Sequence, residues 1–284
     1  MTQPAEESKH VGRLRYDVFF KKVFHKKHLL KAFLNTVLAP ELSAPITDLS
    51  YEPTDFVIAG KSKLIQETKH DVIDVFCLTA QQQRILVELQ KGTSKRAMAR
   101  FLDYQCRNYS NQFPVGADYA QVMPCYSICW FFDLQPPHTY VKETVKLQSD
   151  CEPTDWGFAW EVVALYPQNI PPEHIKQHTI DSLEEWLLLD VIEDIASAQQ
   201  IQQLLQTEEV KEAFDDLDLS ELSEEDIRRI IFEDQVDQNP DLYEEKLREE
   251  RREIAKNLLD VLDIETICQK TSLSREEVVA LQTP

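Results

Sequence analysis

Glycine is scarce in this 284-residue chain, and its scarcity excludes several kinds of nucleotide and hydrolase site. The five glycines are Gly12, Gly60, Gly92, Gly116 and Gly157. No two of them are close enough to form a G-x-G-x-x-G dinucleotide loop or a G-x-x-x-x-G-K phosphate loop. The G-x-S-x-G turn that carries the nucleophile of many serine hydrolases cannot form either.

Long apolar runs are missing as well. A membrane helix needs about 20 consecutive apolar residues, and the longest run here, from Tyr126 to Phe132, is far shorter and contains a serine. The chain opens with polar and acidic residues instead of the apolar stretch of a signal peptide. We therefore expect a soluble, cytoplasmic protein without a membrane partner.

The cysteines and histidines show no metal-binding pattern. The six cysteines include no C-x-x-C pair, and most lie in apolar surroundings, which favours reduced core thiols over a disulfide framework or a zinc site. His174 and His178 are four residues apart, but they follow two prolines and lack the neighbouring glutamate of a zinc-protease helix. The pattern therefore does not favour a metal site at these histidines.

The net charge of −20 is distributed unevenly along the chain. Residues 1–150 contain 19 Lys and Arg against 16 Asp and Glu, a net of +3, whereas residues 151–284 contain 11 against 34, a net of −23. The acidic half will repel phosphate backbones. Any contact with a polyanion is therefore expected in the first half, although charge alone favours ordinary solvated helix faces as the explanation of its basic clusters.

Apolar periodicity predicts a helix, then a mixed sheet, then a helical region. The first helix is expected over 17–38, ended by Pro40, and another is expected over 94–112. Strands are expected over 46–52, 71–78, 84–90, 124–133, 139–147 and 157–166. Helices are expected over 181–198, 208–216, 223–232, 241–262 and 264–281, the last with a capping box of Ser274 and Glu277. This order predicts an α/β fold with one domain over 10–170 and an acidic, all-helical C-terminal region over 171–284.

The strands over 71–78 and 84–90 carry the strongest chemical signal. A short polar link joins them, so a hairpin is expected, with Asp74 on one strand and Glu88 and Gln90 on one face of the next. A carboxylate among apolar strand residues is costly unless it is paired or binds a cation. Two converging carboxylates suit Mg²⁺ or Mn²⁺, which can activate water and neutralise charge on a phosphate. The alternative is that both acids pair with Arg or Lys on a solvated sheet face.

Four blocks in this order resemble the PD-(D/E)XK nuclease family transposases, the recombination-promoting nuclease group. The first block is Tyr16 to Phe24 followed by Phe33-Leu34-Asn35, and the second is Ile73-Asp74-Val75 with Val87-Glu88-Leu89-Gln90. The third is Arg100 to Tyr109 with Val115 to Tyr119 and Met123 to Ile128. The fourth is Glu253 to Lys256 with Ile264 to Ile267 and Leu273 to Glu277. Together the blocks span nearly the whole chain.

The resemblance implies a restriction-endonuclease-like mixed sheet flanked by helices, and metal-dependent cleavage of DNA. Asp74 and Glu88 would then be metal ligands for Mg²⁺ or Mn²⁺, with Gln90 orienting water. Asp17 would be a further acidic group near the metal, unless it instead caps its own helix. The residues that would contact DNA phosphates are Lys21, Lys22, Arg96, Arg100 and Arg107. For each of these, a structural surface role is the alternative.

Two departures from the family pattern bear on this interpretation. Gln90 stands where the superfamily usually has a lysine, which removes a charge that would depress the pKa of the attacking water. Ser272 stands where the family often has a glycine, at a cost of about 1 kcal/mol at a helix C-terminus.

The segment over 264–281 has the length of a helix-turn-helix, but its acidic residues make it a poor groove reader. We therefore expect a DNA endonuclease of low sequence specificity, in the context of recombination or transposition. A homodimer would supply two sites for a double-strand cut, and the acidic C-terminal helices offer a surface for a protein partner. Two alternatives stay open: a catalytically degenerate nuclease fold that acts as a binding module, and a hydrolase of RNA or another phosphodiester.

Overall fold

The computed structural model divides into two compact units, with the boundary after Leu222. It describes residues 10–54, 74–91, 95–113, 116, 118–132, 139–147, 160–238, 240–259 and 261–281. The predicted boundary after residue 170 does not coincide with this division. Helices that follow residue 170 belong to the first unit because they pack on its N-terminal helices; the Trp186 ring, for example, lies 6.0 Å from that of Phe24 and 5.6 Å from that of Phe33.

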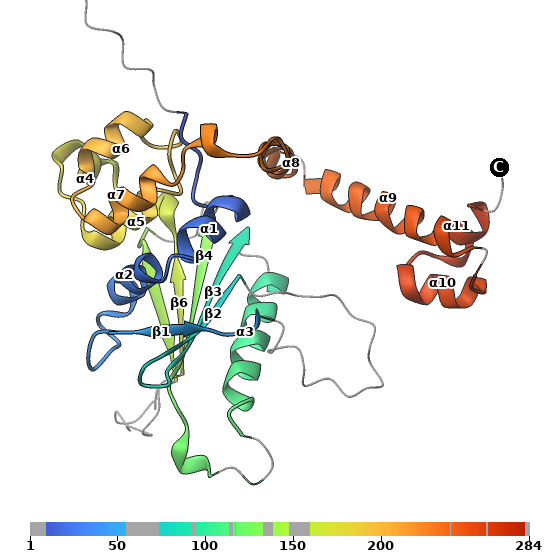
Figure 1. Ribbon diagram of the computed structural model, residues 1–284, viewed down its shortest axis with the longest axis horizontal. Coiled ribbons are helices and arrows are strands. Elements are labelled where there is room, and N and C mark those ends of the chain that lie inside the picture. The colour runs from blue at the N-terminus through green and yellow to red at the C-terminus, as the bar shows by residue number, and fades with distance from the viewer. Residues whose placement is uncertain are drawn as a thin grey trace, which may run out of the picture. The chain divides into compact units, whose positions relative to one another are not determined.

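A six-stranded mixed sheet forms the centre of the first unit (Figure 1), in the order β1-β2-β3-β4-β6-β5. The strands are β1 (Leu49–Tyr51), β2 (Val75–Thr79), β3 (Arg84–Lys91), β4 (Cys125–Phe132), β5 (Lys142–Lys146) and β6 (Trp160–Leu165). The β3–β4 and β4–β6 pairs are parallel and the other pairs are antiparallel. All six predicted strands are confirmed: β3 is one residue longer than predicted, β2 begins later and ends one residue later, and the other four are shorter. Residues 71–73, 133 and 157–159 of the predicted strands lie outside the described part of the chain.

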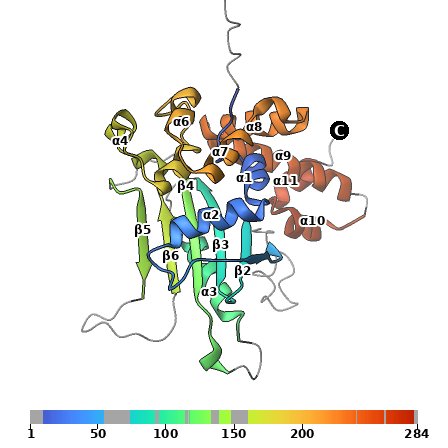
Figure 2. The ribbon, with the colours of Figure 1, turned by 60° about the vertical axis from the view of Figure 1, so that its left-hand side comes forward.

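Helices cover both faces of this sheet (Figures 1 and 2). α3 (Lys95–Ser110) connects β3 to β4 and packs on one face, where Phe101 joins Cys129, Phe131 and Val162 in an apolar cluster. α1 (Asp17–Phe24) and α2 (Lys27–Leu38) cover the opposite face, where the ring of Phe33 stacks on that of Trp130 at 5.5 Å. Because side chains alternate along a strand, Cys129 and Trp130 serve opposite faces.

The remaining helices of the first unit are short. They are α4 (Pro172–Gln177), α5 (Ser182–Leu188), α6 (Ala198–Leu204) and α7 (Glu208–Asp215), with 3₁₀ turns η2 (Tyr119–Gln121), η3 (Pro167–Asn169) and η4 (Leu219–Glu221). Two predicted helices are interrupted. The helix over 17–38 breaks at Lys26 because no apolar residue lies between Phe24 and Leu29. The helix over 181–198 ends at Leu188, and the chain then passes through turns at Asp190 and Val191 and the left-handed Glu193 (φ 66°) before α6 begins.

The first and last described segments of this unit are hydrogen-bonded to each other. The Gly12 N–H donates to the Leu217 carbonyl (2.8 Å) and the Leu219 N–H to the His10 carbonyl (2.9 Å), with a β-bridge between Val11 and Asp218. A β-carbon on Gly12 would come within 2.2 Å of the Phe19 ring, so only glycine allows this close approach.

A buried ion-pair cluster lies just beyond this contact. The Arg15 guanidinium, whose side chain is 5% exposed, donates to the Asp190 carbonyl (3.0 Å), lies 3.5 Å from the fully buried Asp190 carboxylate and also pairs with Asp194. Burial outweighs the nearby Arg15 and raises the pKa of Asp190 to about 7. The buried Arg15–Asp190 pair therefore connects the segment before α1 to the turn after α5.

The second unit contains α8 (Glu224–Gln238), α9 (Pro240–Leu258), α10 (Ile264–Thr271) and α11 (Arg275–Ala280). Ala255, Ile267, Leu273 and Val278 form an apolar core between the last three helices. The predicted capping box of α11 is confirmed: the Glu277 N–H donates to Ser274 Oγ (3.2 Å), and Glu277 Oε2 accepts from the Ser274 N–H (2.9 Å). None of the described helices, in either unit, has the length and apolarity required to cross a membrane.

We expect Ser272→Gly to stabilise the second unit by roughly 1 kcal/mol. Ser272 ends α10 in the left-handed conformation (φ 57°), which strains a residue with a β-carbon and which glycine adopts freely. Native-state hydrogen exchange of the α10 amides in the full chain would measure the change. The neighbouring Ser274→Ala variant should lower protection by a similar amount because it removes the cap of α11; equal or lower protection in Ser272→Gly would contradict the expectation.

Candidate active site

The β2–β3 hairpin brings Asp74 and Glu88 together. Val75 pairs with Val87 in the antiparallel register, so Asp74, directly before β2, comes opposite Glu88. The Asp74 N–H donates to Glu88 Oε2 (3.3 Å), and Asp74 Oδ2 accepts from the Leu89 N–H (2.7 Å). These contacts hold the two carboxyl groups next to each other at the end of the hairpin.

Both carboxyl groups are sheltered from water. Glu88 is 6% exposed. The pKa of Asp74 is raised to about 6, mainly by its removal from water and also by the negative charge of Asp17, against the lowering effects of the Leu89 N–H, Lys21 and Arg100. Two acids in such a setting favour the presence of a bound cation.

Gln90 and Arg100 complete this side of the site. Gln90 lies two residues after Glu88, hence on the same face of β3, which is the face that α3 covers. From α3, Arg100 Nη2 donates to Gln90 Oε1 at 2.6 Å and lies 3.4 Å from Glu88 Oε1. From the sequence, Arg100 was predicted only to contact a DNA phosphate. Its contacts with Glu88 and Gln90 depend on how α3 crosses β3, and the sequence does not show this crossing.

Asp17 and Lys21 approach the site from α1. They form an ion pair with each other (2.8 Å), and both act on the pKa of Asp74. Asp17 is the first residue of α1, and the N-cap is Tyr16, which makes no side-chain cap. The alternative that Asp17 caps its helix is therefore wrong, whereas its role as an acidic group near a metal stays a prediction.

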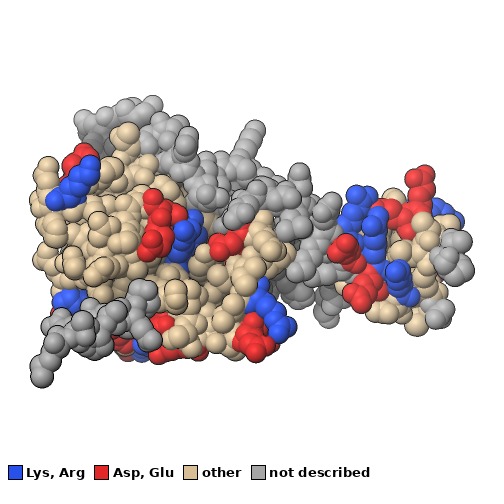
Figure 3. All heavy atoms as spheres, turned by 90° about the horizontal axis from the view of Figure 1, so that it is seen from above, with Lys and Arg blue, Asp and Glu red and all other residues tan. Residues whose placement is uncertain are grey.

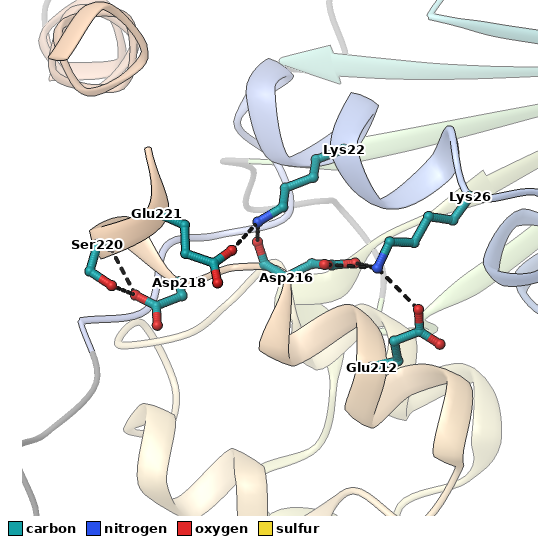
Figure 4. Close-up of polar contacts among 7 residues, drawn as sticks. All are labelled: Lys22, Lys26, Glu212, Asp216, Asp218, Ser220 and Glu221. Atoms are coloured by element: carbon teal, nitrogen blue, oxygen red, sulfur yellow. Dashed lines mark hydrogen bonds and ion pairs between the residues drawn. The ribbon is translucent and has the colours of Figure 1, made fainter. Parts of the chain in front are cut away.

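The other predicted phosphate contacts lie elsewhere in the first unit. Lys22 Nζ donates to the Asp216 carbonyl (2.9 Å) and to Glu221 Oε2 (2.8 Å), as Figure 4 shows, and so fastens α1 to the segment after α7. Arg107 pairs with Asp103 one helical turn away (2.8 Å). The Arg96 side chain lies outside the described residues. For these three residues the phosphate role stays a prediction.

Ion pairing of this kind is common on the surface. Lys26, next to Lys22, pairs with Glu212 (3.0 Å) and Asp216 (2.7 Å) (Figure 4). On the face shown in Figure 3, the described basic side chains of each unit lie next to acidic ones. Lys21 and Arg100, which are themselves paired with Asp17 and Glu88, are the described basic side chains that lower the pKa of Asp74.

The residues at the hairpin fit a divalent cation. Two carboxylates and the Gln90 carboxamide oxygen are hard oxygen donors, the type that Mg²⁺ and Mn²⁺ prefer. No group of three or more His, Cys, Asp and Glu that could hold a metal occurs among the described residues. Mg²⁺ is commonly held by only one or two carboxylates and keeps several waters, so a pair of acids is sufficient.

The histidines identified in the sequence have other roles. His174 Nδ1 lies 2.8 Å from Glu184 Oε1, and His178 ends α4 in the left-handed conformation. All five cysteines in the described ranges are free thiols; Cys77, Cys125 and Cys129 are buried, as expected of core thiols, whereas Cys106 is exposed and Cys268 is half-buried. Cys129 pairs with Glu88 across the parallel β3–β4 register and was not identified from the sequence. Burial raises its pKa well above the usual value, so it remains a protonated thiol beside the acids.

A comparison with known protein families identifies the family of this chain. A family model described as PD-(D/E)XK nuclease family transposase matches residues 14–246. The chain belongs to this family. The match includes every residue named above at the hairpin, and it confirms the restriction-endonuclease-like fold expected from the sequence. No curated protein and no solved structure matches the chain significantly. Membership in the PD-(D/E)XK nuclease family supports a nuclease- or transposase-related function, and nucleases of this superfamily generally use divalent metals.

Proposed function

We propose that this chain is a Mg²⁺- or Mn²⁺-dependent DNA endonuclease that hydrolyses phosphodiester bonds with little sequence specificity. The observation that carries the proposal is the convergence of Asp74 and Glu88 at one end of the hairpin, sheltered from water and facing cationic side chains. Family membership supports the same chemistry.

Each residue at the hairpin has a distinct role in this proposal. Asp74 and Glu88 would hold the metal, which when bound supplies neutralisation of phosphate charge and a more acidic water. Gln90 orients water through its carboxamide, since an uncharged amide cannot act as a general base. Lys21 and Arg100 attract the phosphate, and the Leu89 N–H fixes the Asp74 carboxyl group against β3.

Low sequence specificity follows from what the cations can contact. Lys and Arg that bind phosphates position a duplex but read no bases. The C-terminal segment of α10 and α11 carries Lys270 and Arg275 against Glu265, Glu276 and Glu277, and Arg275 pairs with Glu265. This segment therefore offers little positive charge for entry into a groove.

The proposal is tested by cleavage of supercoiled plasmid. The wild-type protein should nick or linearise the plasmid with Mg²⁺ or Mn²⁺ and not with EDTA, and Glu88→Ala should abolish this cleavage. Glu173→Ala, which removes an exposed acid on α4, should cleave like the wild type. Metal-dependent cleavage that persists in Glu88→Ala would overturn the proposed site, and preference for an RNA strand over a DNA strand of the same sequence would change the substrate to RNA.

One observation favours a second candidate, a catalytically degenerate nuclease fold that acts as a binding module. Position 90 holds an uncharged glutamine, and the Arg100 guanidinium contacts the very oxygens of Glu88 and Gln90 that would face a metal. Calorimetry with Mn²⁺ separates the two candidates. Binding that disappears in Glu88→Gln supports the nuclease, whereas a well-folded wild-type protein that binds no Mn²⁺ supports the degenerate fold with an acidic partner surface.

A further inference from the structure

Arg100 lies where a cation is required. Its Nη2 atom donates to Gln90 Oε1 at 2.6 Å and lies 3.4 Å from Glu88 Oε1, and Glu88 is in turn within hydrogen-bonding distance of Asp74. A single guanidinium thus faces the carboxylate and the carboxamide of β3 that form one side of the proposed metal centre.

We infer that Arg100 is an exchangeable internal cation. It holds Glu88 and Gln90 when no divalent ion is present, leaves them when the ion binds, and then presents its guanidinium to a DNA phosphate. The inference rests on the proposed function and adds to it a competition between a protein side chain and the metal for the same oxygens.

The need for such a cation follows from the burial of Glu88. A carboxylate that is 6% exposed and adjacent to a second carboxyl group is unstable without a compensating positive charge. The guanidinium supplies that charge in the free protein. A divalent ion would supply it better, because it carries twice the charge and binds both acids at shorter distances.

The side chain of Arg100 lies at the rim of a helix that is anchored to the sheet, and its guanidinium also lies 5.9 Å from the centre of the Tyr104 ring. The side chain is 42% exposed, whereas the neighbouring Phe101 and Tyr104 are 2% and 4% exposed and anchor α3 on the sheet. The contact with Glu88 is long for a charge-assisted hydrogen bond, which is usually 2.7–2.9 Å. Release therefore requires new side-chain rotamers at the rim and no shift of α3.

Exchange of this kind couples metal binding to DNA binding. A metal that displaces Arg100 increases the positive charge available to a phosphate, and a phosphate that captures Arg100 exposes the oxygens to the metal. Because coupling between two ligands is reciprocal, each should raise the affinity for the other by the same factor. Loss of Arg100 should weaken this coupling to the part that comes from direct attraction between the metal and the phosphate.

Isothermal titration calorimetry with Mn²⁺, in the absence of DNA, tests the inference. We expect Arg100→Gln to bind Mn²⁺ at least about tenfold more tightly than the wild type, which corresponds to about 1.4 kcal/mol. The matched control is Arg107→Gln on the same helix, which removes an equal charge about 10 Å away along α3. It should change the affinity by no more than about twofold, as expected for a solvated charge at that distance.

The outcomes separate the inference from the function on which it rests. If wild-type binding disappears in Glu88→Gln but Arg100→Gln binds no more tightly than the wild type, the exchange is wrong and the metal centre stands. If neither the wild type nor Arg100→Gln shows Glu88-dependent binding, both are wrong. A second readout is DNA affinity by fluorescence anisotropy with EDTA or with Ca²⁺: Ca²⁺ should raise the affinity of the wild type by a larger factor than that of Arg100→Gln, and equal factors would contradict the exchange.

Discussion

Asp74→Asn is expected to lower the rate of metal-dependent plasmid cleavage by roughly 1000-fold. A catalytic metal supplies several kcal/mol to the transition state, and each 1.36 kcal/mol corresponds to a factor of ten, so loss of a charged ligand worth about 4 kcal/mol gives this reduction. Asparagine keeps an oxygen that can accept from the Leu89 N–H, as Asp74 Oδ2 does at 2.7 Å. Single-turnover cleavage with saturating enzyme measures the effect.

The same substitution should stabilise the metal-free protein at pH 8. The pKa of Asp74 is raised from 3.8 to about 6 in the folded state, so the folded state favours the protonated acid. The contribution of the Asp74 carboxyl group to the free energy of unfolding is therefore fully present below pH 3.8 and is lost as the pH rises through 6. Asparagine carries no charge at any pH, and at pH 8 it should raise the free energy of unfolding by up to about 3 kcal/mol.

Opposite effects on activity and stability distinguish a metal ligand from an ordinary structural acid. Urea unfolding at pH 4 and pH 8 in EDTA measures the stability, and the gain should be absent at pH 4. Asp103→Asn, at an exposed acid of α3 that pairs with Arg107, should change neither quantity appreciably. An Asp74→Asn protein that cleaves at the wild-type rate would contradict the site assignment.

Arg15→Met should be the most destabilising single substitution among the ionic residues of the first unit, at about 3–5 kcal/mol at pH 8. Removal of one partner of a buried pair leaves the other charge uncompensated, and the Asp190 carboxylate that Arg15 faces at 3.5 Å is fully buried. Arg13→Met is the control. Arg13 pairs with Asp194 at 2.8 Å but its side chain is 26% exposed, so its loss should cost less than about 1 kcal/mol.

The effect of Arg15→Met should depend on pH in a definite direction. Burial raises the pKa of Asp190 to about 7, so the acid is largely protonated at pH 5 and contributes little to an ion pair there. The loss of unfolding free energy should therefore be smaller at pH 5 than at pH 8. Equal losses at the two pH values would show that Arg15 acts through packing, its bond to the Asp190 carbonyl and its pair with Asp194 rather than through the Asp190 carboxylate.

The hairpin and its acids could be predicted because they depend on short-range features. Two β-rich runs joined by a short polar link allow few registers, and the register found places Asp74 opposite Glu88. The buried β4 and the capping box of α11 follow in the same way from an apolar run and from the spacing of Ser274 and Glu277. Local sequence was therefore sufficient for the acidic side of the candidate site.

The features that could not be predicted depend on contacts between distant parts of the chain. Arg100 reaches Gln90 only because α3 crosses back over β3, and Lys22 is held by Asp216 and Glu221 from a segment almost 200 residues later. The boundary after Leu222 has the same origin: acidic composition suggested that α4–α7 were separate from the sheet domain, whereas α5 and α7 pack on α2. Composition describes the solvent-exposed face of a helix and gives no information on where its apolar face lies.

The contact between the ends of the first unit determines when this unit can fold on the ribosome. The segment from His10 to Leu14 forms hydrogen bonds with the carbonyls of Leu189 and Leu217 and with the Leu219 N–H, all of which are translated much later. At about 5–20 residues per second, the nascent N-terminus waits on the order of 10 s or more for these partners. Until then α1, which carries Asp17 and Lys21, lacks its anchor. The proposed site is therefore completed only after nearly the whole unit has left the ribosome.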